Sequence, residues 1–154
     1  MVWEELKKEL IFTDFDAKTP DDIFEVLGGE LVHAGYAKES YVQALKDREE
    51  EFPTGLCVDG FGVAIPHTPE EHVNEVATAI AALSHPVTFL EMGTDDPVDV
   101  SLVFMLCVTD PQAHLEQLQQ IVKIIQDKEV LKKLQGTSDQ QAIIDIIKEK
   151  EQAL

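Results

Sequence analysis

One segment marks the centre of the fold: Val98–Val108, which reads VDVSLVFMLCV. After Asp99 it is nearly continuous in apolar residues, which is the pattern of a β-strand covered on both faces. Its apolar part is far shorter than the roughly 18 residues that a membrane span needs. We therefore predict a central strand of a β-sheet that has helices on both sides.

The remaining strands are predicted by shorter β-rich apolar segments. Leu10–Phe12 is a candidate strand that ends at an acidic turn. Three more segments precede the central strand in the chain: Leu56–Val58, Phe61–Ile65 and Val76–Leu83. In the last of these, Ala77–Leu83 is also compatible with a helix by propensity, and this alternative stays open.

Two helices are predicted between the first strand and the others. Thr19 suits the N-cap and Pro20 the first position of a helix that Gly35 ends. A second helix covers about Glu39 to Glu51, and Phe52–Gly55 breaks it.

The C-terminal third is predicted to be helical again. Asp110 as a cap and Pro111 at the first helical position begin a helix with one apolar face. A short helix follows and stops at Gly136. Thr137 and Gln140 then have the spacing of a capping box for a last helix.

The order of helices, sheet and helices predicts an α/β fold, a three-layer α/β/α sandwich with a mixed central β-sheet. The length of 154 residues fits one domain, 1–154. A net charge of −18 opposes nucleic-acid binding, since no Lys and Arg cluster is present to displace counterions. Charged residues between positions 4 and 9 interrupt any signal-peptide core, so we expect a cytoplasmic protein without membrane insertion.

The two cysteines, Cys57 and Cys107, lie in strand-like apolar surroundings, so we expect buried, reduced thiols. A metal site built from both cysteines and His67 would need three distant segments to converge. His67 and His72 are five residues apart and do not share a helix face as zinc-protease histidines do. No phosphate-binding glycine loop is present either, and we expect neither a metal nor a cofactor.

The segment Gly62–His67, which reads GVAIPH, provides the first candidate for chemistry. Pro66 has no N–H for a sheet ladder and keeps Ile65 extended, so the strand ends there and His67 follows it. An imidazole suits proton or phosphoryl transfer, because a neutral, nucleophilic ring nitrogen is available near pH 7. The alternative is an ordinary surface histidine.

Two further side chains could bind an anion. Arg48 has a planar fork suited to phosphoryl oxygens. The alternative, which position alone favours, is that it offsets its acidic neighbours at a helix C-terminus. His114 falls in the first turn of the helix predicted from Pro111, where backbone N–H groups favour an anion and lower an imidazole pKa. The alternative for His114 is a solvated first-turn residue.

These pieces together resemble a known family. Arg48-Glu49, Thr54-Gly55, Ala64–His67 and His114-Leu115 occur in the order seen in type-2 enzyme IIA domains of the bacterial phosphoenolpyruvate-dependent sugar phosphotransferase system, the fructose and mannitol class. The resemblance covers nearly the whole chain. The segment 48–56 looks most like the galactitol-specific branch, whereas Thr68 stands where mannitol and fructose members usually have Gly.

The resemblance implies a phosphocarrier. His67 would be the phosphorylated histidine, which accepts the group from phospho-HPr and passes it to a cysteine of the cognate IIB component, itself associated with the membrane component IIC. Arg48 would stabilise the phosphoryl group, and His114 would donate a hydrogen bond to it. No metal or nucleotide is implied, and the expected docking surface is a modest, largely apolar patch around His67.

Two other functions remain open. A regulator similar to the nitrogen-related IIA paralogues would also be phosphorylated on His67, but it would retain the group and change its affinity for a target. A binding module without covalent chemistry would leave His67 unmodified. The transported sugar and the oligomeric state are not indicated by the residues.

Overall fold

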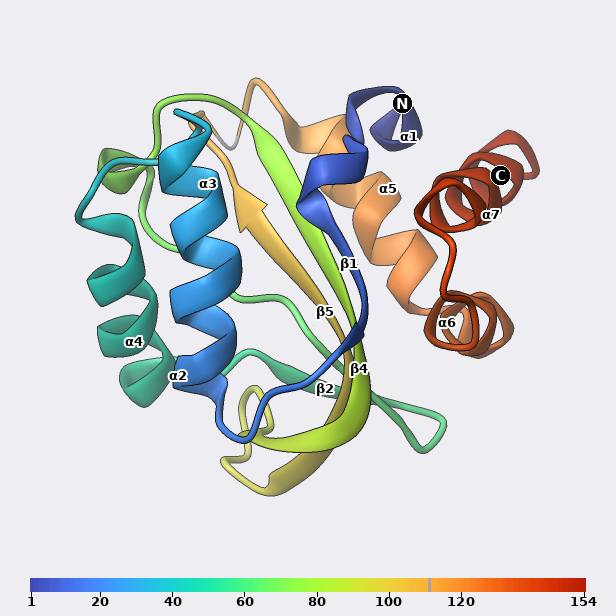
Figure 1. Cartoon of the computed structure of the whole chain (residues 1–154), viewed down its shortest axis with the longest axis horizontal. Helices are drawn as coiled ribbons and strands as arrows, with labels where there is room; N and C mark the ends of the chain where they lie inside the picture. The colour runs from blue at the N-terminus through green and yellow to red at the C-terminus, as the bar shows by residue number, and fades with distance from the viewer. Residues whose placement is uncertain (111) are drawn as a thin grey trace.

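A computed structural model describes residues 1–110 and 112–154. Its sheet has five strands in the order β1-β4-β5-β3-β2 (Figure 1). Their bounds are β1 Ile11–Phe15, β2 Gly55–Val58, β3 Phe61–Ala64, β4 Ala77–Leu90 and β5 Pro97–Cys107. β5 lies in the middle, antiparallel to β4 and parallel to β3, while β1 is parallel to β4 and β2 antiparallel to β3. The predictions of a mixed sheet and of its central strand are confirmed.

Helices cover both faces of the sheet (Figure 1). One layer holds α2 (Pro20–Ile23), a π-helical turn (Phe24–Gly28), α3 (Gly29–His33) and α4 (Tyr41–Glu51). The other holds α1 (Val2–Glu5), α5 (Leu115–Ile125), α6 (Lys128–Gln135) and α7 (Gln140–Gln152), and short 3-10 turns cover Lys8–Leu10 and Glu70–His72.

Alternate residues of the central strands contribute to two separate cores. On β5, Val103 and Met105 pack with the α2–α4 layer, whereas Leu102 and Phe104 pack with the α5–α7 layer. This alternation follows from the two-residue period of a strand. It explains why β5 is apolar at successive positions, and it confirms the three-layer α/β/α sandwich.

The first long helix begins and ends as its sequence predicts. Thr19 caps it, with its hydroxyl accepting from the Asp22 N–H and the Asp22 carboxylate accepting from the Thr19 N–H. Gly35 has a φ of +89° and follows the last turn, where a residue without Cβ is favoured. The second helix begins at Tyr41 rather than Glu39.

Three predicted boundaries were wrong at the C-terminal helices and β4. α5 begins at Leu115 rather than at Pro111, which lies outside the described residues. The Asp110 carboxylate does accept from the Gln112 N–H, as a capping side chain would, but residues 112–114 form a turn and the regular helix starts only at Leu115. α7 is capped by Asp139, not by the predicted pair of Thr137 and Gln140.

The strand β4 extends to Leu90 instead of ending at Leu83. Its register with β5 shifts between Ala82 and Val87, where the exposed residues Ser84, His85 and Pro86 interrupt the apolar pattern. A proline is tolerated at such a bulge because it has no N–H to offer the ladder. The open alternative of a helix over Ala77–Leu83 is excluded.

The cysteines are both free, but only Cys107 is buried. Cys57 is exposed, contrary to expectation, because β2 is an edge strand whose alternate side chains face solvent. Burial raises the pKa of the Cys107 thiol to about 12. No helix in residues 1–110 or 112–154 has both the length and the apolar character that crossing a membrane requires.

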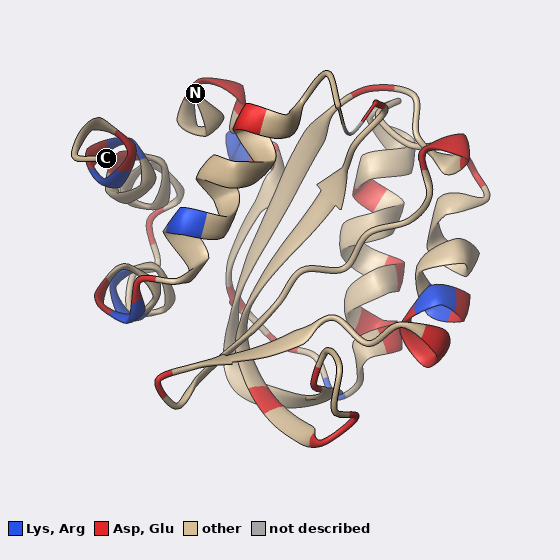
Figure 2. Cartoon of the chain, turned by 180° about the vertical axis from the view of Figure 1, so that it is seen from behind, with Lys and Arg blue, Asp and Glu red and all other residues tan. Residues whose placement is uncertain are grey.

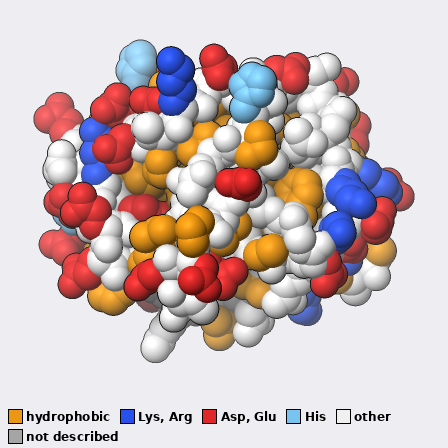
Figure 3. Space-filling view, turned by 90° about the horizontal axis from the view of Figure 1, so that it is seen from below, with side chains coloured by type: hydrophobic (Ala, Val, Ile, Leu, Met, Phe, Trp, Pro, Cys, Tyr) orange, Lys and Arg blue, Asp and Glu red, His pale blue; other side chains and the backbone are white. Residues whose placement is uncertain are grey.

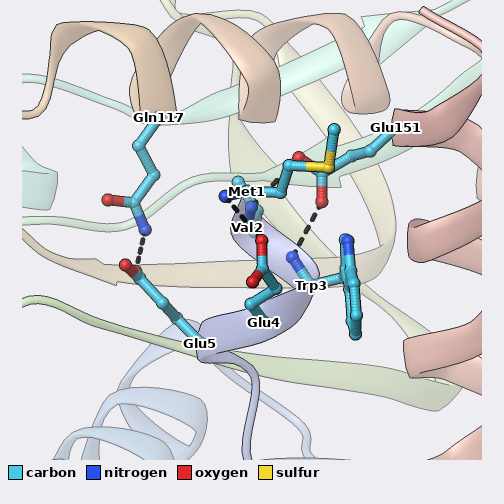
Figure 4. Close-up of polar contacts among 7 residues, drawn as sticks. All are labelled: Met1, Val2, Trp3, Glu4, Glu5, Gln117 and Glu151. Atoms are coloured by element: carbon cyan, nitrogen blue, oxygen red, sulfur yellow. Dashed lines mark hydrogen bonds and ion pairs between the residues drawn. The ribbon is translucent and has the colours of Figure 1, made fainter.

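The N-terminal helix is held by a buried carboxylate from the other end of the chain. Glu151 on α7 is 2% exposed and accepts hydrogen bonds from the N–H groups of Val2 and Trp3 (Figure 4). The Gln117 amide also donates to the Glu5 carboxylate. The two hydrogen bonds to Glu151 satisfy backbone donors that a helix leaves unpaired at its first turn.

Gly62 sets how closely β3 approaches β5. A Cβ at Gly62 would lie 1.9 Å from the Asp99 carbonyl oxygen, whereas one at the helical Gly29 would meet nothing within 4 Å. We expect Gly62→Ala to lower the free energy of unfolding by about 2–3 kcal/mol through overpacking. The matched change Gly29→Ala should raise it by about 0.4–1 kcal/mol. Urea denaturation of both variants checks this, and equal stabilities would contradict the geometry.

Asp127 both caps α6 and contacts α7. Its carboxylate accepts from the N–H groups of Glu129 and Val130 and lies 2.8 Å from Lys150 Nζ. Asp127→Ala should cost about 1 kcal/mol of unfolding free energy. Asp127→Asn keeps a capping side chain and loses only a partly exposed ion pair, so its cost should be under about 1 kcal/mol.

The ion pair also gives this difference a pH dependence. The hydrogen bond from Lys150 lowers the pKa of Asp127 below its ordinary 3.8. The ionised carboxylate therefore stabilises the fold above that pH, and the contribution is lost as the pH falls through the lowered pKa. Denaturation curves should show wild type and Asp127→Asn converging as the pH drops below about 3.8. A constant difference down to acid pH would contradict the contact.

Candidate functional site

The segment that carries His67 is fixed by backbone hydrogen bonds on both sides. β3 ends at Ala64, and the Ile65 N–H then donates to the Thr54 carbonyl at 3.2 Å. The Pro66 carbonyl accepts from the Leu106 N–H of β5 at 2.9 Å. The strand ends before Pro66 as predicted, and the half-buried His67 follows directly.

The imidazole of His67 is held in one orientation. Its Nδ1 lies 2.8 Å from the Ile65 carbonyl oxygen. A carbonyl oxygen only accepts hydrogen bonds, so Nδ1 carries the proton and donates. In the neutral ring the other nitrogen, Nε2, then has the free lone pair. The geometry therefore selects Nε2 as the nucleophilic atom.

Arg48 lies on the last turn of α4 and lines the same cavity as His67. Its guanidinium carbon is 5.0 Å from the centre of the Phe52 ring, a cation–π contact. Within residues 1–110 and 112–154, its buried Nε has no hydrogen-bond partner. The guanidinium is thus positioned by packing while retaining donors for an anion.

The cavity shared by His67 and Arg48 has a volume of about 600 Å³. Its polar side is formed by the segment that follows β3, including Thr68 and Glu70. A second group of lining residues comes from β5, the residue after it, and α5. This apolar wall consists of Leu106, Val108, Leu118, Ile121, Val122 and Ile125.

His114 does not line this cavity. It is the N-cap residue of α5 rather than part of its first turn, and its Nε2 is 3.5 Å from the Thr109 hydroxyl. It borders a small adjoining cavity that shares Leu106 and Leu118 with the larger one. The structure therefore brings two of the three candidate side chains together and places the third next to them.

Sequence reasoning missed a contact between Glu49 and Thr54. Both carboxylate oxygens of Glu49 lie 2.7–3.2 Å from the Thr54 N and Oγ1 atoms, which donate to them. Burial raises the pKa of Glu49, and the hydrogen bonds from Thr54 partly oppose this shift. Both residues stand within the conspicuous pairs Arg48-Glu49 and Thr54-Gly55, but their contact is not visible in the sequence.

The segment after His67 is attached to the loop before α4. The His72 carbonyl accepts from the Lys38 N–H at 2.9 Å, and His72 Nδ1 is 2.8 Å from Ser40 Oγ. Below the site, the buried Tyr41 hydroxyl donates to the Leu106 carbonyl at 2.7 Å. Residues 1–110 and 112–154 contain no group of three or more His, Cys, Asp and Glu side chains arranged to hold a metal ion.

Charge is unevenly distributed around the molecule. Acidic side chains predominate in the α2–α4 layer, where the basic residues are at the end of α4, whereas lysines recur along the α5–α7 layer (Figure 2). The face seen in Figure 3 has apolar surfaces interspersed with acidic groups. Glu70 lines the His67 cavity, and Asp47 and Glu51 border a second hollow on which Arg48 also opens. An anion at this site therefore depends on local donors rather than on the overall field.

Comparison with known proteins places the chain in one family. The family model described as "Phosphoenolpyruvate-dependent sugar phosphotransferase system, EIIA 2" matches residues 4–150. The galactitol-specific EIIA component of the phosphotransferase system of Escherichia coli strain K12 is 31% identical over 113 residues, which cover 73% of this chain and 75% of that protein.

Two solved structures have the same fold. A complex of enzyme IIAMTL with phosphorylated enzyme IIBMTL from Escherichia coli matches with a TM-score of 0.77 and 25% identity, covering 93% of this chain and 96% of that one. The nitrogen regulatory protein IIA-Ntr from Neisseria meningitidis matches with a TM-score of 0.78 and 28% identity, covering 95% and 98%. The chain belongs to the type-2 EIIA family of the phosphoenolpyruvate-dependent sugar phosphotransferase system.

Proposed function

We propose that this protein is a phosphocarrier that receives a phosphoryl group on Nε2 of His67 and passes it on. The observation that carries the proposal is the 2.8 Å contact between His67 Nδ1 and the Ile65 carbonyl, which leaves Nε2 as the nucleophile beside Arg48. Membership of the EIIA family supports the same chemistry.

Two in-line displacements make up the relay. In the first, the Nε2 lone pair forms a bond to phosphorus while the bond from phosphorus to its donor, phospho-HPr, breaks. In the second, a thiolate of the IIB component attacks phosphorus, the P–N bond breaks and Nε2 recovers its lone pair. Throughout both steps the Nδ1–H group of His67 keeps its hydrogen bond to the Ile65 carbonyl, so the ring need not turn between them.

Arg48 supplies the main stabilisation in this proposal. Its guanidinium would contact the equatorial phosphoryl oxygens, where charge is concentrated in the transition state. His114 is a candidate for an additional hydrogen bond, and its place in the adjoining cavity means that the phosphoryl group or the His114 side chain must shift for that contact. The greater part of catalysis is then assigned to His67 and Arg48.

The apolar wall of the cavity is the proposed docking surface for both partners. Leu118 and Val122 of α5 flank the site, and Val122 is 43% exposed. Transient complexes commonly use such a small apolar centre with a polar rim. The solved complex of a IIA relative with phosphorylated IIB supports a IIB component as the acceptor. Association of that IIB component with the membrane component IIC is a further part of the proposal.

Galactitol or a related polyol is the proposed cargo of the transport system. The galactitol-specific relative supports this assignment. A regulatory role is the second candidate, favoured by the likeness to the nitrogen regulatory protein IIA-Ntr. Both functions use the same phosphohistidine, and they differ in whether IIB removes the group.

Intact-mass measurement tests the relay. With phosphoenolpyruvate, enzyme I and HPr, wild type should gain one phosphoryl group and His67→Ala none, because only His67 offers the oriented Nε2. His33→Ala, which removes an exposed histidine, is the matched control, and it should be phosphorylated like wild type.

Addition of the IIB component then separates the two functions. Rapid loss of the group from wild type supports the carrier, and persistence of the group supports the regulator. A wild type that never gains the group, or a His67→Ala variant that still does, would refute the phosphohistidine proposal.

The ring tautomer can be measured without any partner. Long-range ¹H–¹⁵N NMR correlations of wild type, recorded where the imidazole of His67 is neutral, should show this ring protonated at Nδ1. The reason is that Nδ1 donates to the Ile65 carbonyl. Exposed His33 serves as the internal comparison. Protonation of His67 at Nε2 would remove the predicted nucleophile and contradict the mechanism.

A further inference from the structure

We propose that Glu49 and Thr54 are positioning residues for phosphoryl transfer, which together hold both His67 and Arg48 in the geometry for reaction. This inference rests on the proposed function and deepens it. Neither side chain lines the His67 cavity, so neither is proposed to touch the phosphoryl group. Their effect would pass through an unbroken series of hydrogen bonds to the imidazole.

The first link joins α4 to the start of β2. The Glu49 carboxylate accepts from the Thr54 hydroxyl at 2.7 Å and from the Thr54 N–H at 3.1 Å. Thr54 is only 3% exposed, so water does not readily replace these contacts. The carboxylate closes the short connection between helix and strand and fixes the Thr54 backbone.

The second link joins β2 to the end of β3. The Thr54 carbonyl accepts from the Ile65 N–H at 3.2 Å, next to the pairing of Gly55 with Ala64. The carbonyl of Ile65 in turn accepts from His67 Nδ1. One residue, Ile65, therefore receives its position from Thr54 and orients the imidazole. A shift of the Thr54 backbone would move the acceptor that selects the tautomer.

The same contact also places Arg48. Arg48 and Glu49 are neighbours on the last turn of α4, and the Phe52 N–H closes that turn onto the Arg48 carbonyl at 2.6 Å. Anchoring Glu49 to Thr54 fixes the helix end from which the guanidinium extends. The positions of Arg48 and His67 thus both depend on Thr54, although the two residues come from different elements.

A carboxylate is a costly choice for a purely structural contact here. Burial raises the pKa of Glu49, which means that the ionised form is disfavoured in the fold. An ionised carboxylate, however, accepts with both oxygens and has no donor of its own, so it can hold the N–H and the hydroxyl of Thr54 together. A glutamine amide has only one accepting oxygen, because its other end is a donor NH₂ group. The use of a carboxylate therefore points to a requirement that Thr54 be held in one position.

The test compares variants that alter the contact with variants that do not. Glu49→Gln keeps the size but loses one acceptor, and Thr54→Val removes only the hydroxyl. Thr54→Ser keeps the hydroxyl and should restore function. Glu50→Gln is the matched control, because Glu50 is an exposed acid on the same helix turn. Thermal unfolding of each variant shows that the protein measured is folded.

Single-turnover phosphorylation by phospho-HPr provides the first measurement. We expect the rate constant at saturating phospho-HPr to fall about tenfold or more in Glu49→Gln and Thr54→Val, because small misplacements of reacting groups slow transfer strongly. The concentration for half-saturation should stay within about twofold, since the apolar docking wall is unchanged. Thr54→Ser and Glu50→Gln should transfer at the wild-type rate.

The NMR measurement of the His67 tautomer provides the second test, and it does not require phosphoryl transfer. The proposal expects His67 to lose its exclusive Nδ1 protonation in Glu49→Gln and Thr54→Val while the folded state persists. Wild-type rates and an unchanged tautomer in these folded variants would overturn it, as would a rate loss no larger than the loss of folded protein. If Glu49→Gln does not fold, Thr54→Val decides. Failure of wild type itself to be phosphorylated would instead refute the phosphocarrier function.

Discussion

The parallel pairing of β3 with β5 is the constraint on which the site depends. Gly62 allows the two backbones to approach, and the Leu106 N–H extends the contact beyond the strand to the Pro66 carbonyl. His67 follows immediately. Since β5 is buried between two helical layers, the histidine is attached to a strand that is packed on both faces, and it lines a cavity beyond the end of β3.

The layers of this fold were predictable because their signals are local and strong. Val98–Val108 is apolar on both faces, and only a central strand between two cores explains that pattern. Thr19 and Gly35 likewise bound a helix through contacts within a few residues. Errors arose at element ends: Asp110 makes the contact of a cap although the regular helix starts only at Leu115, and Ser84–Pro86 interrupts the register of a strand without ending it.

The site was predictable as a set of candidates but not as an arrangement. Pro66 before His67 indicated a strand end, and Arg48 was the one arginine in an acidic region. Their shared cavity depends on how α4, β3 and β5 pack, which no spacing rule supplies. The bond between Glu49 and Thr54 is equally hidden, because a hydrogen bond across a chain reversal depends on the exact path of the loop. His114 is the N-cap of α5 and not part of its first turn, because the helix starts later than its sequence indicated.

The acidic character of the chain fits a phosphocarrier better than a protein that retains its phosphoryl group. A phosphoryl group adds about two negative charges, and the net charge is already −18. Screening limits the effect of distant acids to about 8 Å, so the groups that matter are near ones such as Glu70, Asp47 and Glu51. In the proposed relay they would oppose the group's retention, while Arg48 and the fixed imidazole would lower the barrier to its transfer. A site that stabilises the transition state more than the bound group favours onward transfer, which is the property a relay needs.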